Sequence, residues 1–166
     1  MIRRLLSFFC CIPVLAGAVP FVQTDKPNVL AFAPEKAKFV RFVIHESSGG
    51  QPCIDELEIY GPGREGNLAL AAKGARATAS SCLSGYAIHQ IAHLNDGKYG
   101  NSHSWIAAGV KDEWAQIELP EAVSVDRVVF SRDRRGRYSD RLAVRFTVLL
   151  SLDGKKWNAV RDLNIP

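Results

Sequence analysis

Residues 113–130 read EWAQIELPEAVSVDRVVF, and residues 145–160 read RFTVLLSLDGKKWNAV. In both stretches apolar side chains alternate with polar ones, which is typical of strands with one buried face. Pro120 is expected to end a first strand, so that a second begins near Val123. A similar stretch, residues 39–61, reads FVRFVIHESSGGQPCIDELEIYG. None of the three carries a nucleophile motif, a phosphate-binding loop or a cage of metal ligands, so they predict a β protein that binds a ligand without transforming it.

The composition is that of one folded domain. The chain has 166 residues, of which 47% are hydrophobic and 23% are charged. It can therefore bury a core, and its length favours a single domain. The net charge of +4 falls to +2 without Arg3 and Arg4, because 19 basic residues then stand against 17 acidic ones. So small a surplus gives no reason to expect a nucleic-acid partner.

The N-terminus predicts a secretion signal. Two arginines precede an apolar run at residues 5–15, and the small residues Ala16 and Ala18 fit a signal-peptidase site. The apolar run is shorter than the about 20 residues that span a bilayer. Residues 1–18 are therefore predicted to be removed, with an uncleaved interfacial anchor as the alternative. The mature protein is then secreted or periplasmic and has no transmembrane segment.

The rest of the chain predicts an all-β domain. Residues 19–37 are interpreted as a linker, because the stretch up to Pro34 has three prolines and little periodicity. From residue 38 to residue 166, short apolar segments are separated by turn sequences such as Asn95-Asp96-Gly97. Long helical periodicity is missing. The pattern predicts an antiparallel β-sandwich or jelly roll.

Several motifs resemble the discoidin family, also called the F5/8 type C or galactose-binding-like domain family. Residues 67–69 (NLA), followed by ATASS, resemble the opening motif of that family. Residues 94–97 (LNDG), with Trp105 downstream, resemble its L-x-D-G motif and the tryptophan that follows. Residues 114–119 (WAQIEL) and residues 148–157, with S-x-D-G-x-x-W, resemble two further signatures. Each motif is weak alone, and in combination they are a strong signal.

The order of these motifs departs from the family. Residues 38–61 resemble its closing strands, yet here they precede the opening motif at Asn67. In one explanation the domain is permuted, and residues 38–61 complete a main body formed by residues 67–160. In the other, the tail of one domain precedes a truncated second domain. Unpaired sheet edges would be costly in the second case, so permutation is favoured. It predicts that the strand near Arg41 pairs within the same sandwich.

The resemblance implies a non-catalytic module that binds a ligand through loops at one end of the sandwich. The implied ligand is carbohydrate, as a glycan on a cell-surface or matrix polymer. One alternative is an adhesion or structural accessory module that contacts another domain of a larger secreted protein. Another, binding to lipid headgroups, needs exposed apolar side chains beside basic ones, which the arginine-rich loop lacks. Nothing in the sequence suggests an enzyme.

The arginine-rich loop at residues 132–141 is the predicted ligand site. It joins two strands, where sandwich binding sites tend to lie. Arg132 and Arg134 are the candidate contacts, because arginine forks bind carboxylate, sulfate or phosphate groups. Under the alternative interpretation the charges of the loop pair internally, Arg132 with Asp133 and Asp140 with Arg141.

Ring side chains supply the other candidate ligand contacts. Tyr138 could stack on a sugar face, and His89 and Trp105 are further candidates. The alternative for every tryptophan is a place in the core, because large aromatic residues dominate sandwich cores. Trp114 and Trp157 match core positions of the family.

The resemblance also implies a structural calcium ion beside the Asp96-Gly97 turn. Asp96 and Glu56 match the relevant positions by motif, and Asn101 and Ser104 are further candidates. Carboxylate and hydroxyl oxygens suit a hard cation, which would stiffen the loop. Alternatively, Asp96 caps its own turn and Glu56 is a solvated strand residue.

Cysteines and histidines allow two more predictions. Cys53 and Cys82 form a possible disulfide in an exported protein, and the alternative is two separate buried thiols. His89 and His93 have a zinc spacing if the segment is helical. However, Gln90 stands where an H-E-x-x-H motif has glutamate, which favours packing or hydrogen bonding near the ligand loops.

Overall fold

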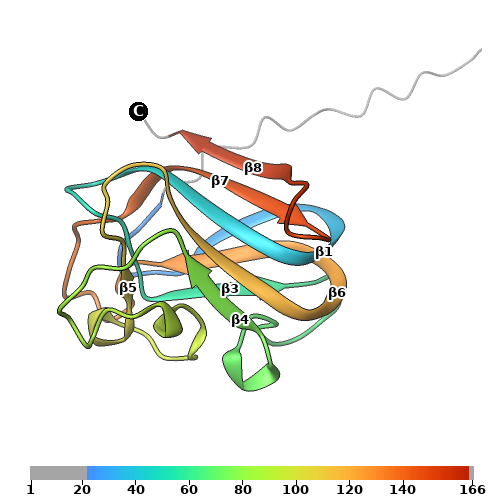
Figure 1. The fold of residues 1–166 in the computed structure, drawn as a ribbon, viewed down its shortest axis with the longest axis horizontal. Coiled ribbons are helices and arrows are strands. Elements are labelled where there is room, and N and C mark those ends of the chain that lie inside the picture. Colours follow the sequence, from blue (N-terminus) through green and yellow to red (C-terminus); the bar gives the residue numbers. More distant parts are fainter. Residues whose placement is uncertain (1–21, 165–166) are drawn as a thin grey trace, which may run out of the picture.

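The computed structural model describes residues 22–164, which form eight strands and three short 3-10 turns (Figure 1). The expected signal peptide lies outside the described residues. The elements are β1 (Asn28–Ser47), β2 (Cys53–Ile54), β3 (Glu56–Tyr60), η1 (Ala71–Lys73), β4 (Arg76–Ala79), η2 (Ile91–Asn95), η3 (Asn101–His103), β5 (Trp105–Ile106), β6 (Glu113–Ser131), β7 (Ala143–Ser151) and β8 (Asn158–Asn164).

One six-stranded antiparallel sheet dominates the fold, in the order β3-β6-β1-β7-β8, with β4 also paired to β6. The first half of β1 pairs with the second half of β6 and the second half of β1 with the first half of β6. Strand β3 joins only residues 127–131 of β6, whereas β7 joins only the second half of β1. Register shifts between Ala31 and Phe39 separate the halves. The long strands therefore contribute to both layers of a β-sandwich.

The core lies between these layers. Phe42 of β1 packs on Phe130 of β6 and Phe146 of β7, with ring centroids 4.7–5.3 Å apart. All three side chains are almost completely buried, and burial of a large apolar side chain stabilises the fold by about 1.5–3 kcal/mol. Val40 and Ile44 are buried on the same face of β1 as Phe42, as the alternation in the sequence predicts.

The predicted fold class is confirmed, including the supply of closing strands from the N-terminal side. The strand around Arg41 pairs with both β6 and β7, and β3 pairs with β6. The predicted linker is wrong for residues 28–37, because they form the first half of β1. Pro34 is compatible with this strand since it lies in a register shift, where the missing N–H breaks no ladder hydrogen bond.

Pro120 does not end a strand, contrary to the prediction. Strand β6 runs from Glu113 to Ser131, and the paired positions jump from Glu118 to Val123. Pro120 lies in this unpaired interval and again costs no ladder hydrogen bond. The interval bends β6 where it passes from one layer to the other.

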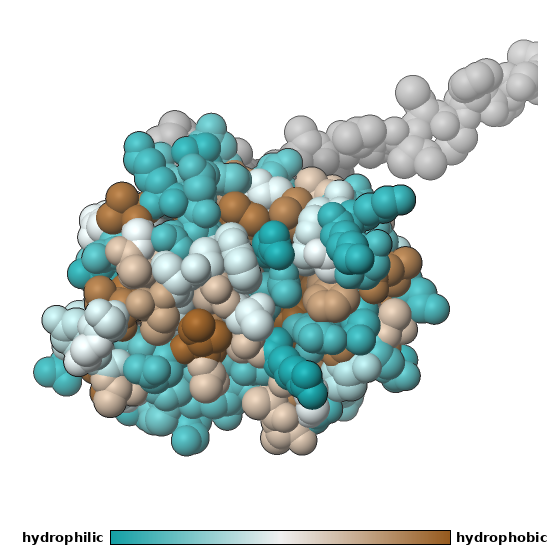
Figure 2. Space-filling model, viewed as in Figure 1, coloured by the Kyte–Doolittle hydropathy of each residue, from teal (hydrophilic) through white to brown (hydrophobic). Residues whose placement is uncertain are grey.

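The irregular segments gather at one end of the sheet, at the lower left of Figure 1 around β5 and the short turns that follow β4. Three backbone hydrogen bonds connect segments at this end, from Ser48 N to Leu142 O, from Leu83 N to Ile106 O and from Ala107 N to Pro52 O. On the face drawn in Figure 2, hydrophobic residues are scattered among polar ones. None of the helices in the described part of the chain has the length and hydrophobicity needed to cross a bilayer.

Candidate ligand-binding site

A hollow of about 340 Å³ opens between the loops at this end of the sandwich. Its lining comes from the segment before η2, from η3 and β5, and from the arginine-rich loop. The lining residues are Leu83, Tyr86, Ile88, His89, Asn101, Ile106, Arg132, Tyr138, Asp140 and Arg141. Three of the five predicted ligand contacts, His89, Arg132 and Tyr138, therefore line one hollow.

Arg132 forms a fixed wall of the hollow. Its side chain is only 2% exposed. Nε donates to Asp140 O at 2.7 Å, Nη2 to Asp140 Oδ1 at 2.8 Å, and Nη1 to Asn101 Oδ1 at 2.9 Å. The Asp140 carboxylate also pairs with Arg141 Nε at 3.2 Å. Internal pairing within the loop is thus present, but Arg132 pairs with Asp140 and not with Asp133.

His89 lines the hollow, and its hydrogen bonding sets the tautomer of the ring. Its Nδ1 lies 2.8 Å from Ser104 Oγ, which itself donates to Asn101 O at 2.9 Å. The serine hydroxyl proton is used in that bond, so His89 Nδ1 is the donor to Ser104 and Nε2 carries a lone pair. Burial lowers the pKa of His89, and the charges of Arg132 and Arg141 lower it further. The imidazole is therefore neutral at pH 7.

Large apolar and aromatic side chains form the rim. Tyr86, Ile88 and Tyr138 are 54%, 43% and 39% exposed, and all three line the hollow. The guanidinium carbons of Arg132 and Arg137 lie 5.5 and 5.6 Å from the Tyr138 ring centroid. The sequence predicted that the arginine-rich loop lacks exposed apolar side chains beside its basic residues, but the fold brings Tyr86 and Ile88 to the loop from a distant segment.

A smaller depression of about 190 Å³ continues from the hollow along the arginine-rich loop. Ile88, Asn101 and Tyr138 border both, and Arg135 and Arg137 line only the smaller one. The combined surface offers an apolar rim between a hydrogen-bonding wall and a basic extension.

Asp133 shapes the loop that carries Tyr138. Its side chain is fully buried, and its carboxylate accepts from the backbone N–H groups of Arg135 (3.2 Å), Arg137 (3.1 Å) and Tyr138 (2.9 Å). A carboxylate that accepts hydrogen bonds from several backbone N–H groups can hold a tight turn that has no regular secondary structure. Sequence reasoning missed this role, although an aspartate that opens a loop with a glycine three residues later is a usable signal.

Two predicted contacts do not reach the hollow. Arg134 pairs with Glu58, donates from Nε to Ser131 Oγ at 2.8 Å, and stacks on Tyr99 with its guanidinium carbon 4.0 Å from the ring centroid. Trp105 is completely buried, and its Nε1 donates to Ser81 O at 2.8 Å. Both are engaged in the interior under the loops, and neither lines the hollow.

The other two tryptophans, Trp114 and Trp157, were predicted to lie in the core, and this prediction is wrong. Trp114 and Trp157 are partly exposed and not in the core. They flank Arg41, whose guanidinium carbon lies 4.4 Å from the ring centroid of Trp114 and 4.2 Å from that of Trp157. Arg41 also donates from Nε to Gln116 Oε1 at 2.9 Å. This cluster covers the outer face of β1 and β6.

Cys53 and Cys82 are free thiols, so the predicted disulfide is wrong. Cys53 is buried in β2, and burial raises its pKa to about 11. The Cys82 thiol lies 3.3 Å from His89 O and is only partly buried. The two thiol groups thus have separate polar neighbours.

Two of the four predicted calcium ligands, Glu56 and Asp96, are acidic groups that influence each other electrostatically. Glu56 is buried, and both carboxylate oxygens accept only weakly from Gly97 N, at 3.2 and 3.3 Å. Burial raises the pKa of Glu56 to about 9. The negative charges of Asp96 and Asp55 also raise this pKa, whereas the hydrogen bond from Gly97 lowers it. The interpretation of Glu56 as a solvated residue is therefore wrong. A hard cation beside Glu56 and Asp96 would replace the proton.

The other two calcium candidates are engaged elsewhere. Asn101 Oδ1 accepts from Arg132, and Ser104 Oγ bonds Asn101 O and His89. The Asn101 side chain lines the hollow, and the Ser104 side chain holds His89. Asp96 does cap its own turn, because Oδ1 accepts from Lys98 N at 2.8 Å.

A comparison with known protein families identifies the family of the chain. The F5/8 type C domain matches residues 76–165, which is more than half of the chain. The protein belongs to the F5/8 type C family. Members of this family are typically carbohydrate- or protein-binding modules and are generally non-catalytic. No curated protein and no solved structure gave a significant match. In this F5/8 type C domain, β1 and β3 precede the matched region and pair with strands inside it.

Proposed function

We propose that this F5/8 type C domain is a non-catalytic carbohydrate-binding module whose site is the hollow between Tyr86, Ile88 and Tyr138. The observation that carries the proposal is the exposure of these three side chains directly beside a fixed polar wall. Sugars offer C–H faces that stack on aromatic rings and hydroxyl groups that need both donors and acceptors. The hollow provides both features within one concave surface.

The polar groups favour a hydroxyl-rich ligand. His89 Nε2 and the Asp140 carboxylate, which is 48% exposed, are acceptors, and the partly exposed Arg141 is a donor. Asp140 offsets the charge of Arg132, so the hollow itself does not demand an anion. Acidic substituents of a glycan would be met by Arg135 and Arg137 in the adjoining depression.

A protein ligand is the alternative within the family, as in an accessory module of a larger secreted protein. A stable protein interface buries about 800 Å² on each partner. A hollow of about 340 Å³ with converging polar groups is closer to a small-ligand site. The carbohydrate proposal is therefore favoured.

A glycan array tests the proposal. We expect the wild-type protein to bind a defined set of glycans and Tyr138→Ala to bind them about tenfold more weakly, because a lost stacking contact costs about 0.5–1.5 kcal/mol beyond area burial. Leu152→Ala, which removes an exposed apolar side chain outside the hollow, is the matched control. An array without any binding, or a Tyr138→Ala variant that binds as tightly as wild type, would refute the proposal.

Binding should weaken in acid. The pKa of His89 lies below its ordinary value of 6.5, so the side chain keeps its Nε2 lone pair at neutral pH and loses it only at lower pH. Protonation would turn the acceptor into a donor beside Arg132 and Arg141. We expect the affinity for an array-selected glycan to be constant at and above pH 7 and to fall as the pH is lowered below 6.5. The dissociation constant, measured across this range, should become independent of pH in His89→Gln.

We also propose that calcium binds at Glu56 and Asp96. The support is the buried Glu56 carboxylate, which has weak amide partners and acidic neighbours. The ion would neutralise both carboxylates and fix the turn that leads to η3.

Export of the protein is proposed from the charged, apolar and small-residue pattern of residues 1–18. A host that expresses the whole chain is expected to deliver it across the membrane with Val19 as the first residue. Intact-mass analysis of the exported fraction measures this directly. Retention of residues 1–18 would favour the anchor alternative.

A further inference from the structure

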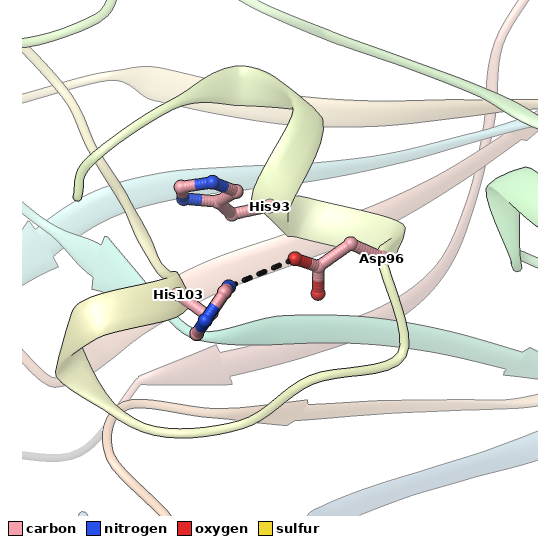
Figure 3. Close-up of side chains that lie close together, drawn as sticks. All are labelled: His93, Asp96 and His103. Carbon is pink, nitrogen blue, oxygen red and sulfur yellow. Dashed lines mark hydrogen bonds and ion pairs between the residues drawn. The ribbon is translucent and has the colours of Figure 1, made fainter. Parts of the chain in front are cut away.

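Two histidines and an aspartate converge beside the loop that forms one wall of the hollow (Figure 3). His93 lies in η2, Asp96 at its C-terminal end and His103 in η3. One ligand atom from each lies within 4.8 Å of the other two, and all three residues are partly exposed. His89, the partner predicted for His93, belongs to the hollow, because the helical spacing is not realised before Ile91.

The surroundings of His93 set its tautomer. Its Nδ1 lies 3.1 Å from Ile88 O and 3.4 Å from Ser104 O. Both neighbours are carbonyl acceptors, so Nδ1 carries the proton and Nε2 keeps the lone pair. Metal-binding histidines commonly donate their second ring nitrogen to a backbone carbonyl in this way, which fixes the ring and raises its basicity.

Asp96 and His103 already have the spacing of two ligands. His103 Nδ1 and Asp96 Oδ2 are 3.1 Å apart. Two ligands of a tetrahedral zinc ion, each about 2.0–2.1 Å from the metal, are separated by about 3.3 Å. The ion would take the place of the proton that the pair shares. The other oxygen, Asp96 Oδ1, is held by Lys98 N at 2.8 Å and orients the carboxylate.

We propose that His93, Asp96 and His103 bind a divalent transition-metal ion of the zinc type. Two nitrogens and one carboxylate oxygen suit Zn²⁺, Co²⁺ or Ni²⁺, whereas calcium takes oxygen ligands. The exposed side leaves a position for water. The site shares Asp96 with the proposed calcium site but does not use Glu56. Because His93 is anchored to the carbonyls of Ile88 and Ser104, a bound metal would brace the wall that carries His89.

Calorimetric titration of the untagged protein with zinc chloride tests the proposal. We expect one zinc ion per chain and an increase in melting temperature. His93→Ala and His103→Gln should each weaken binding by about tenfold or more. His45→Gln is the matched control, because His45 also contacts an aspartate, Asp112, at 2.8 Å, but belongs to no group of three ligands among the described residues.

Cobalt substitution identifies the ligands. Bound Co²⁺ should give visible bands without a thiolate charge-transfer band, which separates the site from zinc capture by cysteine. Glu56→Gln should leave zinc affinity unchanged, and zinc binding should be seen whether or not any glycan binds. Lack of zinc binding by the wild type, or equal binding by wild type and the His93→Ala/His103→Gln double variant, would overturn the proposal.

Discussion

Asp133→Ala is expected to destabilise the domain by about 3 kcal/mol, because a buried charged acceptor of several hydrogen bonds is removed. The backbone amides of Arg135, Arg137 and Tyr138 all lose their partner. The loop then loses the conformation that places the Tyr138 ring on the rim of the hollow. Ligand binding should consequently fall by more than in Tyr138→Ala. Denaturant unfolding and glycan titration measure the two effects.

The turn between β7 and β8 supplies a matched control. Asp153 Oδ1 accepts from Lys155 N at 2.8 Å and Lys156 N at 2.9 Å, so it has the same capping role as Asp133 in an exposed turn outside the hollow. Asp153→Ala should leave ligand binding unchanged and reduce stability less. If Asp133→Ala kept wild-type affinity for the glycan, Asp133 would not be the residue that shapes the site.

Glu56→Gln is expected to stabilise the calcium-free protein strongly at neutral and alkaline pH. The pKa of Glu56 is about 9 in the folded protein against an ordinary value of 4.5. The folded state therefore binds more protons than the unfolded state between these two values. The free energy of unfolding then falls as the pH rises through this window, by at most about 1.4 kcal/mol per pH unit from this group. Below about pH 4.5 the variant and the wild type should be equally stable.

Calcium should oppose the loss of stability at high pH in the wild type, but not in Glu56→Gln. An ion held by Glu56 and Asp96 stabilises the ionised carboxylate, so the melting temperature at about pH 8 should rise with calcium and fall with chelator. Glu56→Gln should lose that response. Glu118→Gln, which removes a carboxylate paired with Lys38 at the surface, controls for the loss of charge. A wild-type melting temperature unaffected by calcium and chelator would contradict the calcium proposal, and a Glu56→Gln variant with the pH dependence of wild type would contradict the raised pKa.

The strands could be predicted from the sequence where alternation is regular. In β1, the buried side chains of Val40, Phe42 and Ile44 follow the period of two that their spacing indicates. The first half of the same strand was missed because Pro27 and Pro34 suggested a linker. Pro27 lies just before the strand and Pro34 in a register shift. Such tolerance depends on the partner strand, which a local pattern cannot reveal.

The sequence indicated which loop lines the site, but not which side chains of that loop face the hollow. The arginine-rich loop does line the hollow, yet Arg132 faces it and Arg134 turns to Glu58 on another strand. The choice depends on tertiary neighbours and not on spacing. Tyr86 and Ile88 were missed for the same reason, because only the folded chain brings them beside Tyr138. An aromatic residue that follows a glycine in an irregular segment, as Tyr86 follows Gly85, was the available signal.

The central claim is that the ligand occupies the hollow. Chemical-shift mapping of the ¹⁵N-labelled protein with an array-selected glycan tests it most directly. We predict that the largest amide shifts fall in residues 83–89, 101–106 and 132–141, which line the hollow. Shifts concentrated instead around Trp157 and Lys36, at the depression beside the β7–β8 turn, would contradict the account.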